Sequence, residues 1–275
     1  MPVTTSTTDQ LMALSEKNAS SAPSTPAVVF DRVCKRYKQQ TVLHDVSFSI
    51  ERGQSIAVVG LNGAGKTTML RALLGFVGVD SGSIKLFDQD ASCAGARQSV
   101  AFLPERLILC PDLSGWRSLQ TLLLLRGASV SRQVCEHELA QLGFPIDKLD
   151  APARTYSKGM SQKIGLAAAI CSNARLIILD EPLSGLDPMA RRAMHVEMMR
   201  CRARETGLLF TAHSLDGLET LCDQVLVIHQ GQLKFFGPPA GLQAASPITP
   251  SSKNTSRSLE QAFLDLVAMP LETAS

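Results

Sequence analysis

The sequence predicts an α/β domain with a largely parallel sheet and an inserted helical subdomain. Short apolar, β-branched runs alternate with helical stretches, a pattern typical of parallel sheets with helical crossovers. A glycine-rich turn joins one of these runs directly to a helix. In the middle of the chain, from about residue 116 to 170, helical stretches follow one another without a strand signal between them.

The predicted elements can be placed in order along the chain. The strands are Ser55–Val59, Val100–Leu103, Leu176–Leu179, Leu208–Thr211 and Val225–Ile228. Lys66–Leu74 has helical spacing and is followed by Gly75 and Gly78, which favour a helix end there. The helices of the middle region are Trp116–Arg126, Ser131–Leu142 and Ser157–Cys171. They form a subdomain, at about 105–172, between two parts of the α/β core.

Two segments outside the core differ in composition. Residues 1–26 are rich in Ser, Thr, Ala and Pro, and we expect a disordered extension. Within 246–275, a linker rich in prolines and hydroxyl side chains precedes Leu259, Phe263, Leu264 and Val267, which have the spacing of a short amphipathic helix. The folded core is therefore expected at 27–245.

Charge and size exclude some classes of function. The 275 residues are 45% hydrophobic, which is enough for a substantial core. Basic residues number 27 and acidic residues 25, without a block of like charge. The sequence therefore lacks the electrostatic signature of a nucleic-acid binder, and we expect no nucleic-acid partner.

The sequence also bears on cellular location. It has no signal-like N-terminal segment, and no apolar run approaches the roughly 20 residues that span a bilayer. The seven cysteines form no C-x-x-C pair, which favours reduced core cysteines over a zinc or redox site. We expect a cytoplasmic protein that reaches a membrane only through a partner.

The glycine-rich turn matches the phosphate-binding P-loop (Walker A) pattern G-x-x-x-x-G-K-[ST] at every fixed position. It reads Gly60, Leu61, Asn62, Gly63, Ala64, Gly65, Lys66 and Thr67, followed by Thr68. Its glycines let successive backbone N–H groups face an anion at the positive end of a helix. Lys66 would neutralise the β- and γ-phosphates, and the Thr67 hydroxyl would ligate Mg²⁺. These nine residues are the predicted ATP-binding loop.

Polar residues follow two other predicted strands. Asp180 and Glu181 come directly after Leu176–Leu179, and His213 comes shortly after Leu208–Thr211. In open α/β sheets, ligands lie beyond the carboxyl ends of the strands. We therefore expect Asp180 to face Mg²⁺, Glu181 to polarise the attacking water, and His213 to contact the γ-phosphate. Each of these residues alone could equally be structural.

Together with Tyr156–Gln162, these motifs resemble the nucleotide-binding subunits of ABC transporters. Ser157 and Gly159 match the signature motif, Ser184–Asp187 resembles the D-loop, and Tyr37 is placed like the aromatic residue that stacks on adenine. The resemblance covers about 28–238. It implies a P-loop NTPase core with a mostly parallel sheet, an antiparallel β edge and an inserted helical subdomain.

The resemblance also implies a mechanism and partners. Ser157 and the helix that begins there would cap the γ-phosphate bound by a second ATPase subunit, in a homodimer or heterodimer that sandwiches two ATP molecules. Hydrolysis would separate the dimer and drive an integral membrane permease. The chain would then be peripheral on the inner face of the cell membrane.

Two departures from the family pattern point to one branch. Glu105 stands where many members have a Gln that ligates Mg²⁺, and the signature has Lys158 and Met160 in place of Gly and Gln. Both variants resemble exporter ATPases whose permease is a separate polypeptide, of the drug-export or copper-accessory type. The residues Ser258–Leu266 are similar to the tail of that branch. The cargo is not encoded in this chain.

Two other functions have to be weighed. A soluble ABC ATPase acting on nucleic acid or ribosomes usually carries two ATPase domains or a long coiled coil, and neither occurs here. A non-hydrolysing ATP sensor conflicts with the presence of Lys66, Asp180, Glu181 and His213. Energising a membrane exporter is the better interpretation.

A last expectation concerns the segment from Glu105 to Leu119. It is apolar for an inter-domain loop, since it contains the run Leu107, Ile108 and Leu109 and the only tryptophan, Trp116. Such surface suits a cytoplasmic helix of a permease. The alternative is that these side chains pack inside the subdomain.

Overall fold

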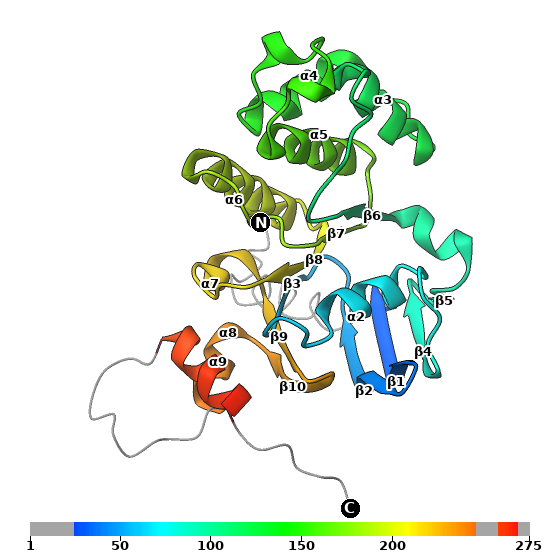
Figure 1. The fold of residues 1–275 in the computed structure, drawn as a ribbon, viewed down its shortest axis with the longest axis vertical. Helices are drawn as coiled ribbons and strands as arrows, with labels where there is room; N and C mark the ends of the chain where they lie inside the picture. Colours follow the sequence, from blue (N-terminus) through cyan, green and yellow to red (C-terminus); the bar gives the residue numbers. More distant parts are fainter. Residues whose placement is uncertain (1–24, 246–257, 269–275) are drawn as a thin grey trace, which may run out of the picture.

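The computed structural model describes residues 25–245 and 258–268 (Figure 1). Most of the extension predicted for 1–26 lies outside these residues, as does the linker at 246–257. Two sheets and a group of helices make up the described chain. The larger sheet forms the centre of the molecule, with the helical subdomain above it and the smaller sheet beside its lower part in the view of Figure 1.

The larger sheet has six strands in the order β10-β9-β3-β8-β7-β6. They are β3 (Ser55–Val59), β6 (Val100–Leu103), β7 (Leu176–Leu179), β8 (Gly207–Ala212), β9 (Gln224–His229) and β10 (Gln232–Gly237). All neighbours pair in parallel except β9 and β10. The five strands predicted from apolar runs are confirmed, and the parallel ones end along one edge of the sheet, where the site residues follow.

The smaller sheet is antiparallel and has the order β2-β1-β4-β5. It consists of β1 (Val28–Tyr37), β2 (Gln40–Ile50), β4 (Ser81–Leu86) and β5 (Gln89–Asp90). The antiparallel edge implied by the family resemblance is confirmed. β1 interrupts its pairing with β2 at several register shifts, and Arg32 has a φ of 49°. These irregularities break the alternation of apolar and polar side chains, which is why these strands carry a weak signal in the sequence.

Three helices form the inserted subdomain, α3 (Gly115–Leu125), α4 (Arg132–Gln141) and α5 (Lys158–Cys171). Each begins at a serine whose hydroxyl accepts a hydrogen bond from the N–H three residues later: Ser114, Ser131 and Ser157. Such serine caps satisfy one of the free N–H groups of the first turn and fix where the helix starts. The inserted helical subdomain is confirmed.

The remaining α-helices belong to the core and its C-terminal side. They are α2 (Lys66–Leu73), α6 (Pro188–Ala203), α7 (Leu218–Leu221), α8 (Pro239–Ala245) and α9 (Leu259–Ala268). α9 lies against α8 at the lower left of Figure 1. Short 3₁₀ helices occur at Ala94–Ser99, Ile146–Lys148 and Ala153–Thr155. α6 was not predicted from the sequence, although it is the longest α-helix in the described part of the chain.

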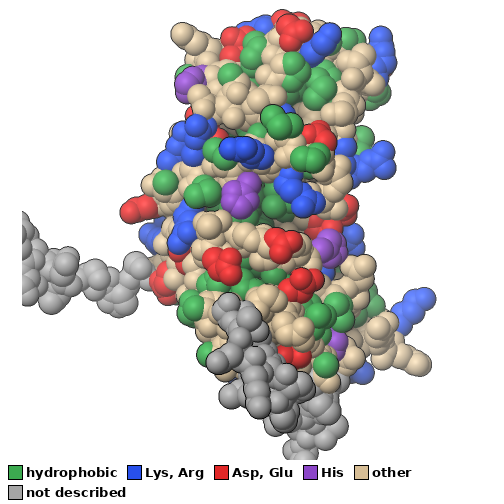
Figure 2. Space-filling view, turned by 90° about the vertical axis from the view of Figure 1, so that its left-hand side faces the viewer, with side chains coloured by type: hydrophobic (Ala, Val, Ile, Leu, Met, Phe, Trp, Pro, Cys, Tyr) green, Lys and Arg blue, Asp and Glu red, His purple; other side chains and the backbone are tan. Residues whose placement is uncertain are grey.

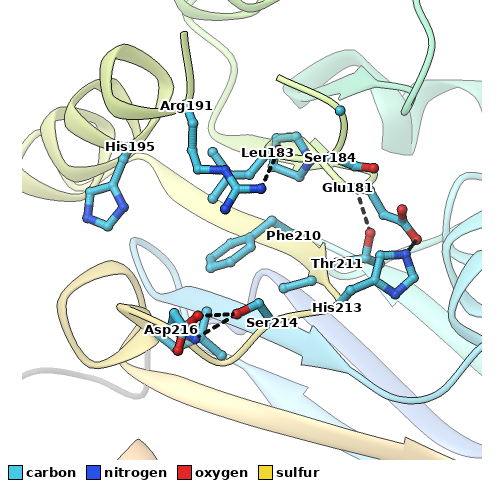
Figure 3. A pocket seen from close by; sticks show the side chains of 14 residues that line it. Glu181, Leu183, Ser184, Arg191, His195, Phe210, Thr211, His213, Ser214 and Asp216 are labelled. Carbon is cyan, nitrogen blue, oxygen red and sulfur yellow. Dashed lines mark hydrogen bonds and ion pairs between the residues drawn. The ribbon is translucent and has the colours of Figure 1, made fainter. Parts of the chain in front are cut away.

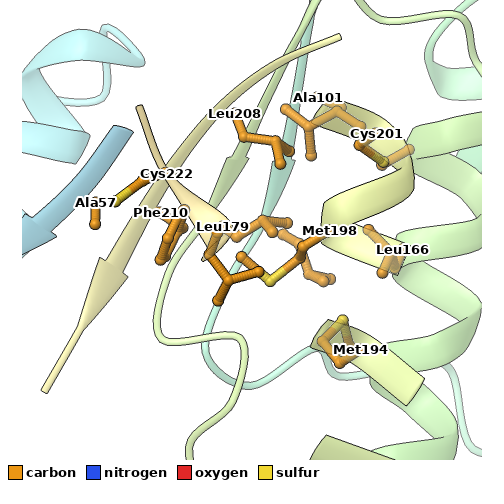
Figure 4. Packing of buried hydrophobic residues seen from close by; sticks show 14 of the residues in the cluster. Ala57, Ala101, Leu166, Leu179, Met194, Met198, Cys201, Leu208, Phe210 and Cys222 are labelled. Atoms are coloured by element: carbon orange, nitrogen blue, oxygen red, sulfur yellow. The ribbon is translucent and has the colours of Figure 1, made fainter. Parts of the chain in front are cut away.

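The parallel sheet is buried on both faces. Because side chains alternate along a strand, Ala57 and Val59 of β3 join one apolar cluster and Ile56 and Val58 join the other. The first cluster is continuous from the sheet through α6 into the helical subdomain (Figure 4). The second lies between the sheet, α2 and the antiparallel sheet. The subdomain and the ATPase core therefore share one hydrophobic core.

Candidate functional site

The predicted phosphate loop connects β3 to α2. Gly60 has no room for a side chain, since a Cβ atom there would lie 2.4 Å from the carbonyl oxygen of Ile228. Gly65, with a φ of 112°, adopts a backbone conformation that other residues rarely tolerate. Lys66 folds back over the loop, and its Nζ donates to the carbonyl oxygens of Gly60 at 2.7 Å and Leu61 at 3.2 Å.

Lys66 is buried, with 6% of its surface exposed. Burial lowers the pKa of its ammonium group, while the nearby carboxylates of Glu181 and Asp180 act in the opposite direction and favour the charged form. A buried cation that is held by carbonyl oxygens, with two acids close by, is prepared to receive an anionic ligand. Lys66, Asp180 and Glu181 thus lie close together at the phosphate loop.

A cavity of about 320 Å³ and a smaller one of about 220 Å³ meet at Glu181. The smaller cavity is the one over the phosphate loop, and it is lined by Val42, Asn62, Gly63, Ala64, Gly65, Lys66, Thr67, Thr68 and Glu181. Leu61, at the edge of the loop, is 46% exposed. This space brings most of the predicted ATP-binding residues together with the candidate catalytic Glu181.

Asp180 and Glu181 follow the last residue of β7, beside the end of β8. The Thr211 hydroxyl on β8 donates to Oδ1 of Asp180 at 2.8 Å and accepts the backbone N–H of Glu181 at 2.7 Å. Glu181 has a φ of 49°, in the left-handed region. Thr211 is 1% exposed. It therefore fixes both acidic residues, and the sequence analysis missed it.

His213 and Glu181 come from neighbouring strands and meet side chain to side chain. Nε2 of His213 lies 2.5 Å from Oε1 of Glu181 (Figure 3). The Glu181 side chain is 16% exposed and that of His213 is 44% exposed. The pair therefore opens toward solvent from the imidazole side, while the carboxylate stays sheltered between the two cavities.

The larger cavity lies on the other side of this pair, between the end of β8 and α6 (Figure 3). The Arg191 guanidinium reaches the carbonyl oxygen of Leu183 at 3.5 Å, and His195 lies 3.3 Å from the Thr220 hydroxyl. The first contact holds the residue before the D-loop against α6, and the second joins α6 to α7; Ser184 and Gly185 of the D-loop line the cavity. The D-loop therefore forms a wall next to Glu181.

Ser157 and Gly159 begin α5 in the helical subdomain, away from α2 and the phosphate loop (Figure 1). The Ser157 hydroxyl accepts the N–H of Met160 at 3.2 Å. Among the described residues, the lining of the phosphate cavity includes none from the signature motif. A single chain thus does not bring Ser157 to its own phosphate loop.

Glu105 lies on the loop after β6 and does not line the phosphate cavity within the described structure either. Its Oε1 lies 3.6 Å from Nζ of Lys158, and its side chain is 51% exposed. Of the three predicted metal ligands, Thr67 lines the cavity and Asp180 faces Lys66 and Thr211. Glu105 would have to turn to join them.

The candidate metal ligands are oxygen donors from three separate segments. The described residues contain no group of three or more His, Cys, Asp or Glu side chains arranged for a metal ion. Thr67, Asp180 and Glu105 all offer oxygen atoms, and Mg²⁺ is usually held by one or two protein oxygens together with phosphate oxygens and water. The residues present therefore fit a magnesium ion that arrives with a nucleotide.

Tyr37 ends β1, in a hairpin whose second strand carries Val42 to the edge of the phosphate cavity. Tyr37 is 41% exposed, and Nζ of Lys35 lies 5.4 Å from its ring centroid. The ring does not line the phosphate cavity within the described structure.

The apolar loop after Glu105 is only partly exposed. Ile108 is 81% exposed, but Leu107 and Leu109 are half-buried and pack against the core cluster. Trp116 also packs there, with the Arg132 guanidinium 5.3 Å from its ring centroid. For Leu107, Leu109 and Trp116 the structure therefore favours the alternative of packing inside the subdomain, and Ile108 is the exposed side chain of the run.

Two general surface properties complete the description. Figure 2 shows basic and acidic side chains interspersed on the face that carries α6 and α7, without a block of one sign. Within residues 25–245 and 258–268, no helix is both long and apolar enough to cross a bilayer.

Comparisons with known proteins agree with this geometry. The family described as ABC transporter matches residues 43–184. An uncharacterized ABC transporter ATP-binding protein of Nostoc is 36% identical over 198 residues, which are 71% of this chain and 59% of that protein. This chain thus spans less than two thirds of that relative.

Two further similarities cover a larger share of both chains. The Nod factor export ATP-binding protein I of Ralstonia nicotianae is 34% identical over 221 residues, covering 78% of this chain and 68% of that protein. A solved structure described as an ATP binding subunit of an ABC transporter has a TM-score of 0.75 at 28% identity and covers 87% of this chain and 99% of its own. With the phosphate loop, the paired acids and the inserted subdomain in place, this chain belongs to the ABC transporter family of ATPases, as one of its ATP-binding subunits.

Proposed function

We propose that this protein binds ATP with Mg²⁺, hydrolyses it in a head-to-tail dimer, and thereby energises a membrane permease of the exporter type. The observation that carries the proposal is the contact between His213 and Glu181, at the edge of the cavity that the phosphate loop lines. A phosphate loop alone binds nucleotide. A sheltered carboxylate beside it, held by an imidazole, supports hydrolysis.

Nucleotide binding rests on the loop and on Lys66. The backbone N–H groups at the start of α2 face the phosphates, and the Lys66 ammonium balances their charge. Thr67, Asp180 and Glu105 would hold Mg²⁺, which when bound neutralises charge on the β- and γ-phosphates. Tyr37 would stack on the base.

In the hydrolytic step, Glu181 orients a water molecule and accepts a proton from it as the water oxygen bonds to the γ-phosphorus. The bond between that phosphorus and the oxygen bridging to the β-phosphate breaks, which leaves ADP and inorganic phosphate. His213 holds the carboxylate and faces the γ-phosphate from the solvent side. The Thr211 hydroxyl keeps both acids in position.

In the dimer, the signature motif of one subunit would complete the ATP site of the other. Ser157 caps a helix whose free N–H groups and positive end suit an anion. Its separation from the phosphate cavity of its own chain supports a role toward the γ-phosphate of a second subunit. Gly159, next along the same turn, would allow close approach of the phosphate.

The exporter branch is supported by the departures at Glu105, Lys158 and Met160 and by the Nod factor export proteins among the relatives. We infer a permease encoded as a separate polypeptide and a location on the inner face of the cell membrane. The domain organisation proposed with it is a core at 27–245, a helical subdomain at about 105–172 and the flanking segments 1–26 and 246–275. A nucleic-acid or ribosome-directed ATPase is the second candidate, but the near-even charge balance of 27 basic and 25 acidic residues does not favour it.

The test compares Glu181→Gln with Lys66→Ala and the unaltered protein. Glu181→Gln should bind ATP and slow hydrolysis by roughly 10²-fold or more, the scale for losing a positioned base. With ATP and Mg²⁺ it should run as a dimer by light scattering, and as a monomer without nucleotide. Lys66→Ala should bind ATP weakly and stay monomeric.

The outcomes separate the alternatives. Full turnover by Glu181→Gln would remove Glu181 from the mechanism. A monomer in every condition, also with any ATPase subunit encoded nearby, would overturn the sandwich. Tight ATP binding without turnover in the unaltered protein would favour a sensor, and salt-dependent nucleic-acid binding would favour the second candidate.

A further inference from the structure

Two of the three side chains by which this chain departs from the common family pattern, Glu105 and Lys158, lie next to each other. Nζ of Lys158 is 3.6 Å from Oε1 of Glu105, although the two residues belong to the signature motif and to the loop after β6. The same Nζ donates to the carbonyl oxygen of Ser184 in the D-loop at 2.9 Å. One ammonium group therefore connects three functional segments of one chain.

A second contact of the same helix holds the backbone of this loop. Gln162 follows Lys158 by one helical turn, so both face the loop. Its Nε2 donates to the carbonyl oxygens of Pro104 at 3.0 Å and of Glu105 at 2.5 Å, and Gln162 is 1% exposed. The helix therefore holds the loop at two points: Gln162 binds the carbonyl groups of Pro104 and Glu105, and Lys158 ties the Glu105 side chain to Ser184 of the D-loop.

The ion pair between Lys158 and Glu105 contributes little to the stability of the fold. The side chains are 34% and 51% exposed, and ion pairs with this exposure contribute little to folding. The charges matter more for the neighbouring site. A carboxylate binds Mg²⁺ more strongly than an amide does, and a Glu105 side chain turned to the metal position would add repulsion toward the other acids and the phosphates whenever no metal ion is bound.

We propose that Lys158 is a positioning residue for Glu105. It holds the carboxylate away from the metal position, balances its charge, and ties it to Ser184, so that Glu105 turns to Mg²⁺ only by leaving Lys158. The inference rests on the proposed function, because it assigns Glu105 to the metal bound with ATP. As a result, the paired Glu105 and Lys158 would bind the metal ion about as weakly as a neutral ligand does.

The proposal predicts the sign of a change in metal affinity. Removing Lys158 frees the carboxylate and removes a nearby positive charge, and both effects favour a bound cation. Lys158→Met should therefore tighten metal binding, by about three- to tenfold for one partly screened charge. In a Glu105→Gln background the same substitution should change metal binding little. Damage to the fold would weaken binding in both backgrounds.

The first experiment uses the nucleotide-free protein and needs no ATPase activity. Amide hydrogen exchange of residues 105–109 and 184–186 is compared in the unaltered protein, Lys158→Met, Lys158→Arg and Lys163→Met. Lys163 is the matched control, since it lies on the same helix and its Nζ donates to the carbonyl oxygen of Gly143 at 2.9 Å. Lys158→Met should speed exchange several-fold in both segments. Lys158→Arg and Lys163→Met should leave these segments near the unaltered rates.

The second experiment measures metal affinity directly. The Glu181→Gln protein with one bound ATP is titrated with Mn²⁺, and free Mn²⁺ is followed by electron paramagnetic resonance. Lys158→Met, Glu105→Gln and the double variant complete a double-mutant cycle. Tighter Mn²⁺ binding in Lys158→Met, abolished by Glu105→Gln, is the expected result.

Weaker or equal binding in Lys158→Met, or the same change in both backgrounds, would overturn the proposal. Unchanged exchange in the nucleotide-free protein would overturn it as well. If the unaltered chain binds no ATP, the proposed function fails by itself, and the exchange experiment still decides whether Lys158 restrains the two segments.

Discussion

The Thr211 hydroxyl donates a hydrogen bond to Oδ1 of Asp180 at 2.8 Å. Thr211 lies near the end of β8, and Asp180 directly follows the neighbouring strand β7. The same hydroxyl oxygen accepts the N–H of Glu181 at 2.7 Å, at a residue with a φ of 49°. A buried threonine therefore determines where both acids point, although it would not touch the nucleotide itself.

Thr211→Val should lower ATPase activity by about ten- to hundredfold, because Asp180 loses a donor and the Glu181 N–H loses its acceptor. Thr211→Ser, which keeps the hydroxyl, should retain most of the activity. The unfolding free energy of Thr211→Val should fall by about 1–3 kcal/mol, the cost of leaving a buried polar group unpaired. Steady-state kinetics and urea unfolding measure the two effects. Equal activity of the two variants would contradict the role given to the hydroxyl.

His213→Ala should lower kcat by about ten- to hundredfold with a smaller change in KM, because the imidazole supports the hydrolytic step more than binding. His137→Ala is the matched control, since His137 is exposed on α4 and remote from the site. A kcat within twofold of the unaltered protein for His213→Ala would exclude a catalytic contribution from the pair with Glu181.

Ser157 can be tested in trans. Ser157→Asp keeps a good helix cap for the N–H of Met160 but places a negative charge against the γ-phosphate. Ser157→Asp and Lys66→Ala should each be inactive alone. In an equal mixture of the two, each mixed dimer holds one intact composite site, built from the phosphate loop of the Ser157→Asp chain and the signature motif of the Lys66→Ala chain, so ATPase activity should reappear. Mixing that restores no activity above either variant would contradict sites shared between subunits.

The exposed residue of the apolar loop gives a test of permease docking. Ile108→Glu should leave folding and basal ATPase activity within a few-fold of the unaltered protein, since Ile108 is 81% exposed, and should abolish membrane recruitment by the permease. Leu107→Glu should instead destabilise the protein, because Leu107 packs against α5 and the core. Co-sedimentation with permease-containing membranes and thermal unfolding separate the effects. Undiminished recruitment of Ile108→Glu would place docking elsewhere.

Thiol labelling tests the packing of the core. Burial raises the pKa of Cys171, Cys201 and Cys222 to about 12, whereas Cys93 and Cys110 are exposed. A thiol with a raised pKa holds almost no reactive thiolate at pH 8. Cys93 and Cys110 should therefore react rapidly with a thiol reagent, and the three buried cysteines only after unfolding. Mass spectrometry of labelled peptides identifies the sites, and rapid labelling of Cys201 in the folded protein would contradict the burial of α6.

How well each element could be predicted depends on how clearly its own residues show the pattern of a strand or a helix. β3, β7 and β8 are continuous apolar runs because both faces of the sheet are covered, so their type and position could be predicted. α6 was missed because its stripe of Met194, Met198 and Cys201 is narrow and flanked by arginines. Asp187 as N-cap and Pro188 in the first turn were a usable signal for its start.

The same distinction holds for the site. The phosphate loop is contiguous, so its residue types alone indicate how they act together. Thr211 became identifiable only through the register of the sheet, in which Leu179 pairs with Phe210 and the next residues lie side by side. The contact between Lys158 and Glu105 depends on how α5 packs over the loop after β6, and no local pattern encodes it.

The apolar cluster shared by the helical subdomain and the sheet limits how the molecule can move. Leu119, Leu139 and Ile164 of the subdomain belong to one cluster with Ala57 and Leu179 of the sheet. Opening a hinge between the two parts would expose this cluster to water. Any rotation of the subdomain during a catalytic cycle must therefore proceed by shear, with small sliding of packed side chains. The subdomain and the sheet should unfold in a single cooperative transition, and neither should be stable when separated from the other.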